Sequence, residues 1–145
     1  DPECEALMMR LMSDILPALI ASADGQLNRI TLRWRSESAL SVVLASKGYP
    51  NSYEKGTLIG ELAPDSETVT IFHAGTTRSD KNLLLATGGR VLVVTALGDG
   101  VTAARKLAYE TIESIKWPNG FCRTDIGWRA VARESIRDGC GKFPR

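Results

Sequence analysis

The sequence predicts an α+β fold in which several antiparallel strands lie between helical segments. Three observations predict it: a helical apolar pattern over residues 4–23, a block of short β-type segments after residue 30, and helical patterns over residues 101–116 and 129–137. Strands that follow one another directly, rather than alternating with helices, favour an antiparallel sheet over βαβ units.

The first element has the features of a helix start. Asp1 suits an N-cap, Pro2 the first helical position, and Glu3 the positive end of the helix dipole. Apolar residues then recur at i, i+1 and i+4 and form a wide stripe, in which Pro17 predicts a kink or break; Asp24–Gly25 ends the segment. A chain that opens on a helix already under way predicts a fragment of a longer protein, whose missing upstream domain covers the stripe.

The expected strands are short and are bounded by loop residues. Residues 30–35 alternate apolar and polar side chains, which is typical of a half-buried strand, whereas residues 47–56 have loop composition. Thr87–Arg90 lies between two apolar runs and predicts a hairpin turn. The expected strands cover residues 30–35, 41–45, 69–73, 83–85 and 91–94.

Composition excludes several classes of protein. With 43% hydrophobic and 24% charged residues, the composition is that of neither a disordered nor a membrane-spanning protein. A net charge of +1 gives no large positive electrostatic field with which to attract nucleic acid. Three cysteines without a CxxC pair, and no visible signal peptide, favour the cytoplasm. The only histidine, His73, excludes a zinc site built on two or three histidines of this chain, and we expect no metal ligands.

Three local motifs leave alternatives open. Gly98–Ala103 fits the dinucleotide pattern G-x-G-x-x-A, and Asp125 follows at about the right distance, but a preceding hairpin strand favours a simple glycine turn before a helix. His73 is either a general base at a strand end or a structural residue. Gly88–Arg90 either presents N–H groups and a guanidinium to a phosphate or forms a hairpin that needs positive φ.

Five stretches in order carry a resemblance to a known family. They are Asp1–Glu3, Lys47–Pro50 with Tyr53–Gly56, Phe72–Thr76, Gly88–Leu92 with Val94–Gly98, and Arg123–Arg129. Together they span nearly the whole chain and resemble the C-terminal part of glycinamide ribonucleotide synthetase, the phosphoribosylamine–glycine ligase family. Glu5 and Thr87 depart from the family pattern, which usually has Gln or Met at the first position and Asn at the second.

The resemblance implies an ATP-grasp ligase of purine synthesis that joins glycine to 5-phosphoribosylamine through a glycyl phosphate, with release of ADP and phosphate. ATP and Mg²⁺ would be bound mainly by upstream lobes. Residues 1–25 would be the terminal helix of the ATP-grasp lobe. Residues 26–145 would be a barrel-sandwich-like C-terminal domain, similar to that of biotin carboxylase, forming one wall of the substrate site. We expect this chain alone to be inactive; the alternative is a non-catalytic binding module derived from such a domain.

The resemblance also implies roles for individual residues. Asp1 and Glu3 would form the catalytic set, at the glycine and phosphate end of the site, unless they only cap the helix. The substrate-binding set would line the phosphoribosylamine pocket and hold its 5-phosphate, and it comprises His73, Gly75, Thr76, Gly88, Gly89, Arg90, Arg123 and Arg129.

Overall fold

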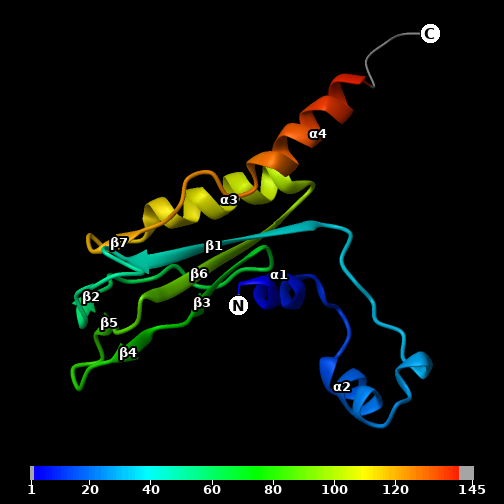
Figure 1. Ribbon diagram of the computed structural model, residues 1–145, viewed down its shortest axis with the longest axis horizontal. Helices are drawn as coiled ribbons and strands as arrows, with labels where there is room; N and C mark the ends of the chain where they lie inside the picture. Colours follow the sequence, from blue (N-terminus) through cyan, green and yellow to red (C-terminus); the bar gives the residue numbers. More distant parts are fainter. Residues whose placement is uncertain (1, 141–145) are drawn as a thin grey trace.

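The computed structural model describes the backbone of residues 2–140 and the side chains of residues 2–137. Figure 1 shows the α+β arrangement that the sequence predicts, with strands between helices. The elements in chain order are α1 (Glu3–Arg10), α2 (Ile15–Ala23), the 3₁₀ helix η1 (Leu27–Arg29), β1 (Ser38–Ser46), β2 (Thr57–Leu58), β3 (Val69–His73), β4 (Thr76–Arg78), β5 (Leu84–Ala86), β6 (Arg90–Gly98), α3 (Val101–Ser114), β7 (Gly120–Phe121) and α4 (Trp128–Cys140).

The strands form two antiparallel sheets. The larger has the order β3-β6-β1-β7, and the smaller has the order β2-β5-β4. Strand β1 pairs with β6 from Ser38 opposite Gly98 to Ala45 opposite Arg90, with a register shift after Leu44. The long central pair β1–β6 therefore forms the frame to which the shorter strands are added.

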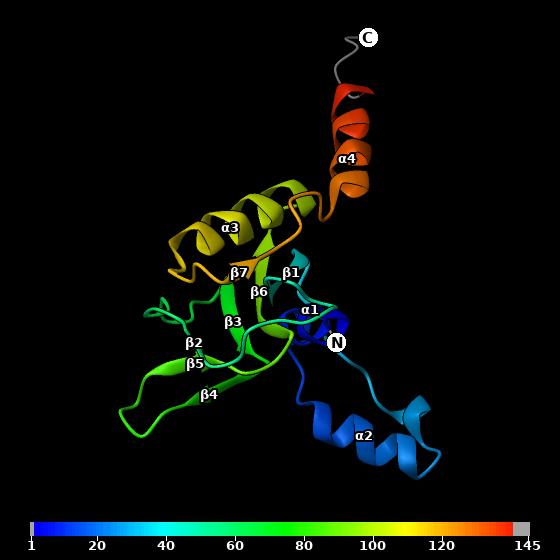
Figure 2. The same ribbon diagram turned by 60° about the vertical axis from the view of Figure 1, so that its left-hand side comes forward.

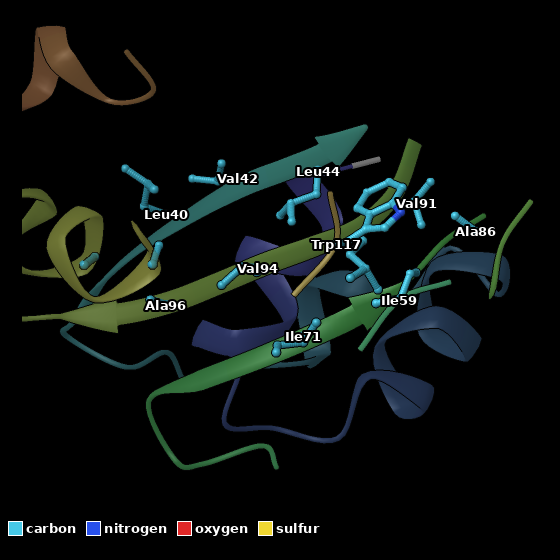
Figure 3. Packing of buried hydrophobic residues seen from close by; sticks show 13 residues of the cluster. Leu40, Val42, Leu44, Ile59, Ile71, Ala86, Val91, Val94, Ala96 and Trp117 are labelled. Atoms are coloured by element: carbon cyan, nitrogen blue, oxygen red, sulfur yellow. The ribbon is translucent and has the colours of Figure 1, made fainter. Parts of the chain in front are cut away.

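Both faces of the central pair are covered by helices. On one face the alternating side chains of Leu40, Val42 and Leu44 pack in the buried cluster with Ala104 and Ala108 of α3, whose small side chains allow close approach. Figure 3 shows this cluster around β1 and β6. The opposite face is contacted by α1, and Figures 1 and 2 place α1 and α3 on opposite sides of the sheet.

Burial on both faces explains why β6 is an almost unbroken apolar run. Residues 91–97 are all buried, and the one polar side chain among them, Thr95, places its hydroxyl 2.8 Å from the Ser41 hydroxyl. A buried hydroxyl with a hydrogen-bond partner avoids the desolvation penalty of an unpaired one. The Thr95 side chain can therefore be buried on the α1 face of the sheet.

The break in the N-terminal helical pattern lies upstream of the position expected. α1 begins at Glu3 with Pro2 in the capping position, and the helical run stops at Leu11; Pro17 lies within the first turn of α2, where proline removes no intrahelical hydrogen bond. The expected kink at Pro17 is therefore wrong. α2 ends at Ala23, just before Asp24–Gly25, as expected.

Residues 30–35 do not form the strand that their alternating pattern predicts, so that prediction is wrong. Their backbone pairs with the α1–α2 connection over one short stretch: Met12 N–H donates to Arg33 O at 2.9 Å, and Leu11 forms an isolated bridge with Trp34. Their alternating pattern reflects this short contact rather than a place in either sheet.

The expected hairpin over residues 83–94 is also wrong. β5 pairs with β4 and β2, whereas β6 pairs with β1 and β3, so Thr87–Gly89 carries the chain from one sheet to the other. Gly88 and Gly89 do not adopt the positive φ that a two-residue hairpin turn needs.

The glycine turn before α3 is closed by a carboxylate from α4. Gly100 has φ of 94°, and Glu134 accepts hydrogen bonds from Val101 N–H at 2.5 Å, Thr102 N–H at 2.9 Å and the Thr102 hydroxyl at 2.7 Å. The protein's own anion therefore lies where a dinucleotide phosphate would bind, which agrees with the rejection of that motif. Within the described residues, no helix combines the length and apolarity needed to cross a bilayer.

We predict that Glu134→Gln lowers the melting temperature at pH 7 by a few degrees. Hydrogen bonds from the Thr102 hydroxyl and from two backbone N–H groups lower the pKa of Glu134, so its ionised form stabilises the fold above the ordinary glutamate pKa of about 4.3. This stabilisation is lost as the pH falls through the lowered pKa. Thermal unfolding across pH should therefore show a gap at pH 7 that closes in acid, with the exposed Glu110→Gln as control; a gap unchanged in acid would contradict the role of the charge.

Candidate functional site

A pocket of about 300 Å³ opens between the N-terminal end of α1 and the β1–β7 edge of the larger sheet. Its floor is apolar, because alternate residues of β1 point toward α1 and Phe121 of β7 lies beside Ala45. The lining residues are Pro2, Ser41, Val43, Ala45, Tyr49, Arg90, Phe121, Cys122, Arg123 and Ile126.

Two arginines from distant parts of the chain lie at this pocket. Arg90 begins β6 opposite Ala45, and Arg123 follows β7. The start of α1 lies at the same pocket through Pro2, and a helix N-terminus carries partial positive charge. Guanidinium groups above an apolar floor suit a ligand with an anionic end and a less polar body.

Arg90 is placed by a buried serine at the end of β1. Ser46, which is 2% exposed, donates from its backbone N–H to Gly89 O at 2.8 Å and from its hydroxyl to Gly88 O at 2.9 Å. Gly89 packs against the rings of Tyr49 and Tyr53. The segment before Arg90 is therefore attached to β1, which fixes where the arginine enters the pocket.

Gly75 and Gly88 form a close backbone crossing. A Cβ added to Gly75 would lie 2.6 Å from both Gly88 Cα and Arg90 O, and one added to Gly88 would lie 2.8 Å from Gly75 Cα. Gly88 N–H donates to Gly75 O at 3.0 Å, and Gly75 N–H donates to Arg90 O at 3.0 Å. Gly88 N–H, a candidate phosphate donor in the sequence, is thus bonded within the protein.

His73 lies apart from the pocket that Arg90 and Arg123 line, called the arginine pocket from here on. Its Nδ1 is 3.0 Å from the Thr76 hydroxyl, and its side chain lines a second pocket of about 450 Å³ with Glu61, Arg78 and Asn82. The structure therefore separates the predicted substrate-binding residues into two groups, with His73 in a different pocket from Arg90.

Of the other predicted residues, Arg123 lines the arginine pocket, whereas Arg129 and Glu3 do not. Arg123 donates from Nε and Nη2 to the two carboxylate oxygens of Asp125, at 2.9 and 2.7 Å, and this arginine lowers the pKa of Asp125. Arg129 lies in the first turn of α4 with its guanidinium 5.3 Å from the centre of the Trp128 ring, outside the arginine pocket. Glu3 is exposed in the first turn of α1 and is absent from the lining of that pocket, and Asp1 lies outside the described residues.

Sequence reasoning missed several lining residues. Tyr49 had a signal, because it belongs to the Lys47–Pro50 motif that carries part of the family resemblance. Ser41 and Phe121 had none, because only the strand pairing brings their side chains to the pocket. Cys122 is a free thiol whose pKa is raised by burial, so it lines the pocket in its neutral form at neutral pH.

Among the residues that the structure describes, no group of three or more His, Cys, Asp or Glu side chains converges. The arginine pocket offers cationic groups and no cluster of acidic ligands, so its chemistry fits an anion rather than a metal ion.

Comparison with known proteins supplies a family. Residues 39–129 match the family described as "Phosphoribosylglycinamide synthetase, C domain". The chain is 55% identical over 134 residues to the phosphoribosylamine–glycine ligase of Agrobacterium fabrum, covering 92% of this chain and 31% of that protein. It is 48% identical over 139 residues to the chloroplastic phosphoribosylamine–glycine ligase of Arabidopsis thaliana, covering 94% of this chain and 26% of the relative.

A solved structure gives the same family. The crystal structure of phosphoribosylamine–glycine ligase from Thermotoga maritima superposes with a TM-score of 0.59 at 31% identity, covering 75% of this chain and 27% of that chain. The chain spans about a third of the length of the curated relatives it matches.

We predict that Gly75→Ala destabilises the fold by about 2 kcal/mol or more, because the new methyl group meets the backbone of Gly88 and Arg90, which no side-chain rotation can relieve. Urea unfolding measures the change, and Ala74→Ser, which adds one atom at an exposed neighbouring position, is the control. Equal midpoints for Gly75→Ala and the unsubstituted chain would contradict the close crossing.

Proposed function

The chain belongs to the phosphoribosylglycinamide synthetase C-domain family, and we propose that it supplies one wall of the substrate site of a phosphoribosylamine–glycine ligase. The proposed reaction joins glycine to 5-phosphoribosylamine and releases ADP and phosphate. ATP and Mg²⁺ activate the glycine carboxyl group in this proposal, and the upstream part of the full-length protein binds both.

The pairing of Arg90 and Arg123 at one apolar pocket carries the proposal. A sugar phosphate has a dianionic end, which a guanidinium binds with parallel hydrogen bonds, and a ribose body, which an apolar floor and the Tyr49 ring can cover. Arg90 is the principal phosphate ligand in this assignment, and Arg123 is the second.

Holding the phosphate end gives the chain its role in the reaction. A substrate fixed at one end presents its amine in a defined direction, so the encounter with the activated glycine needs less further ordering. Asp1 and Glu3 keep their proposed place at the glycine end, and His73, which contacts the Thr76 hydroxyl, lies in the second pocket, away from the phosphate.

An exposed apolar surface supports the presence of upstream lobes. Leu16, Leu19 and Ile20 on α2 are 58%, 58% and 54% exposed, and Met12 before them is 54% exposed. A contiguous apolar surface of this kind is typical of an interface. We propose that the upstream lobes of the full-length protein cover this surface.

The free thiols at Cys4 and Cys122 suit the cytoplasm as the compartment of the protein.

In the full-length protein, we expect Arg90→Ala to raise the KM for phosphoribosylamine by about tenfold or more, because a charge-assisted bond to the phosphate is lost. The KM for ATP should change little. Steady-state kinetics measure both constants, and Lys106→Ala, an exposed cation on α3, is the matched control. An unchanged KM for phosphoribosylamine would end the assignment of Arg90.

The 145-residue chain alone should release no ADP in a glycine- and phosphoribosylamine-dependent manner, because the proposal assigns ATP binding to upstream residues. A coupled ADP assay compares it with the full-length protein. Activity of the isolated chain would overturn this division of labour. An inactive full-length protein would favour the alternative of a non-catalytic binding module.

A further inference from the structure

The connecting segment, residues 122–127, runs from β7 to α4 alongside α3 (Figure 1). It contributes Cys122, Arg123 and Ile126 to the arginine pocket. Because the segment is not part of either sheet, its carbonyl groups need donors from elsewhere. The location of Arg123 therefore depends on whatever holds this backbone.

Two side chains of α3, one turn apart, hold it. Arg105 donates from Nε to Ile126 O at 2.9 Å and from Nη2 to Thr124 O at 2.7 Å. The planar fork of the guanidinium suits two carbonyls at once. The segment is thus attached to α3 at two points on the C-terminal side of Arg123.

Tyr109 adds the contact at Arg123 itself. Its hydroxyl donates to Arg123 O at 2.6 Å and accepts from Ile126 N–H at 3.3 Å, so its single hydrogen and a lone pair are both used. Burial raises the pKa of Tyr109, which keeps the hydroxyl protonated as a donor at neutral pH. The Arg105 guanidinium lies 5.0 Å from the centre of the Tyr109 ring, which links the two side chains.

We propose that Arg105 and Tyr109 are positioning residues for the ligase reaction, which fix the backbone of Arg123 and so place its guanidinium at the rim of the substrate pocket. This inference rests on the proposed function. Asp125 completes the arrangement, because its carboxylate holds the same guanidinium through two hydrogen bonds. The backbone of Arg123 is therefore fixed from α3, and its side chain is oriented from within the segment.

A double-mutant cycle in the full-length enzyme tests the inference. Tyr109→Phe removes only the hydroxyl and should raise the KM for phosphoribosylamine roughly three- to tenfold, the effect of one lost hydrogen bond, with kcat and the KM for ATP nearly unchanged. Combined with Arg123→Ala, the same change should alter that KM less than about twofold, because the residue through which Tyr109 acts is gone.

The control is Thr111→Val, which removes another hydroxyl of α3. The Thr111 hydroxyl donates to Leu107 O within the same helix and makes no hydrogen bond to the connecting segment. The kinetic constants of this variant should equal those of the unsubstituted enzyme. Should Tyr109→Phe reduce the yield of folded enzyme, Arg105→Lys provides the same cycle, because one ammonium group cannot match both carbonyls.

Two results would overturn the inference: an unchanged KM in Tyr109→Phe, or a KM effect of equal size with and without Arg123. The second result would show that Tyr109 acts on the fold rather than through Arg123. An inactive unsubstituted full-length protein is a different result, because it would reject the proposed function together with every role that rests on it.

Discussion

Burial of β6 on both faces is the constraint on which the rest of the structure depends. Residues 91–97 are covered by α3 on one side and by α1 on the other. Pairing with β1 fixes the register, and the Gly75–Gly88 crossing fixes where β6 begins. These contacts together place Arg90 beside the N-terminal end of α1, so the pocket follows from the way the central strand is covered.

Periodicity predicted the elements whose burial is regular. β3 and α3 were located closely because one apolar pattern runs through each of them. The hairpin over residues 83–94 failed because the two adjacent apolar runs belong to different sheets: β5 pairs with β4 and β2, whereas β6 pairs with β1 and β3. Residues 30–35 failed for a related reason: a short local contact gives the same alternation as a strand in a sheet.

The site was predictable only in part. Arg90 and Arg123 were named from the resemblance, and the structure brings both to one pocket, whereas His73 lies in another. The order of motifs along the chain does not reveal that the chain passes from one sheet to the other between these motifs, which places Arg90 and His73 in different pockets. Ser41 shows the same limit, because an ordinary strand serine becomes a pocket residue through the register of β1 alone.

We propose that the arginine pocket holds the phosphate of the substrate. The decisive experiment is a crystal structure of the full-length protein with the reaction product, a glycinamide ribose 5-phosphate. We expect the phosphate within hydrogen-bond distance of the Arg90 guanidinium, with the ribose over Val43 and Ala45. A phosphate in the His73 pocket, or one held entirely by upstream residues, would show that the arginine pocket does not bind it.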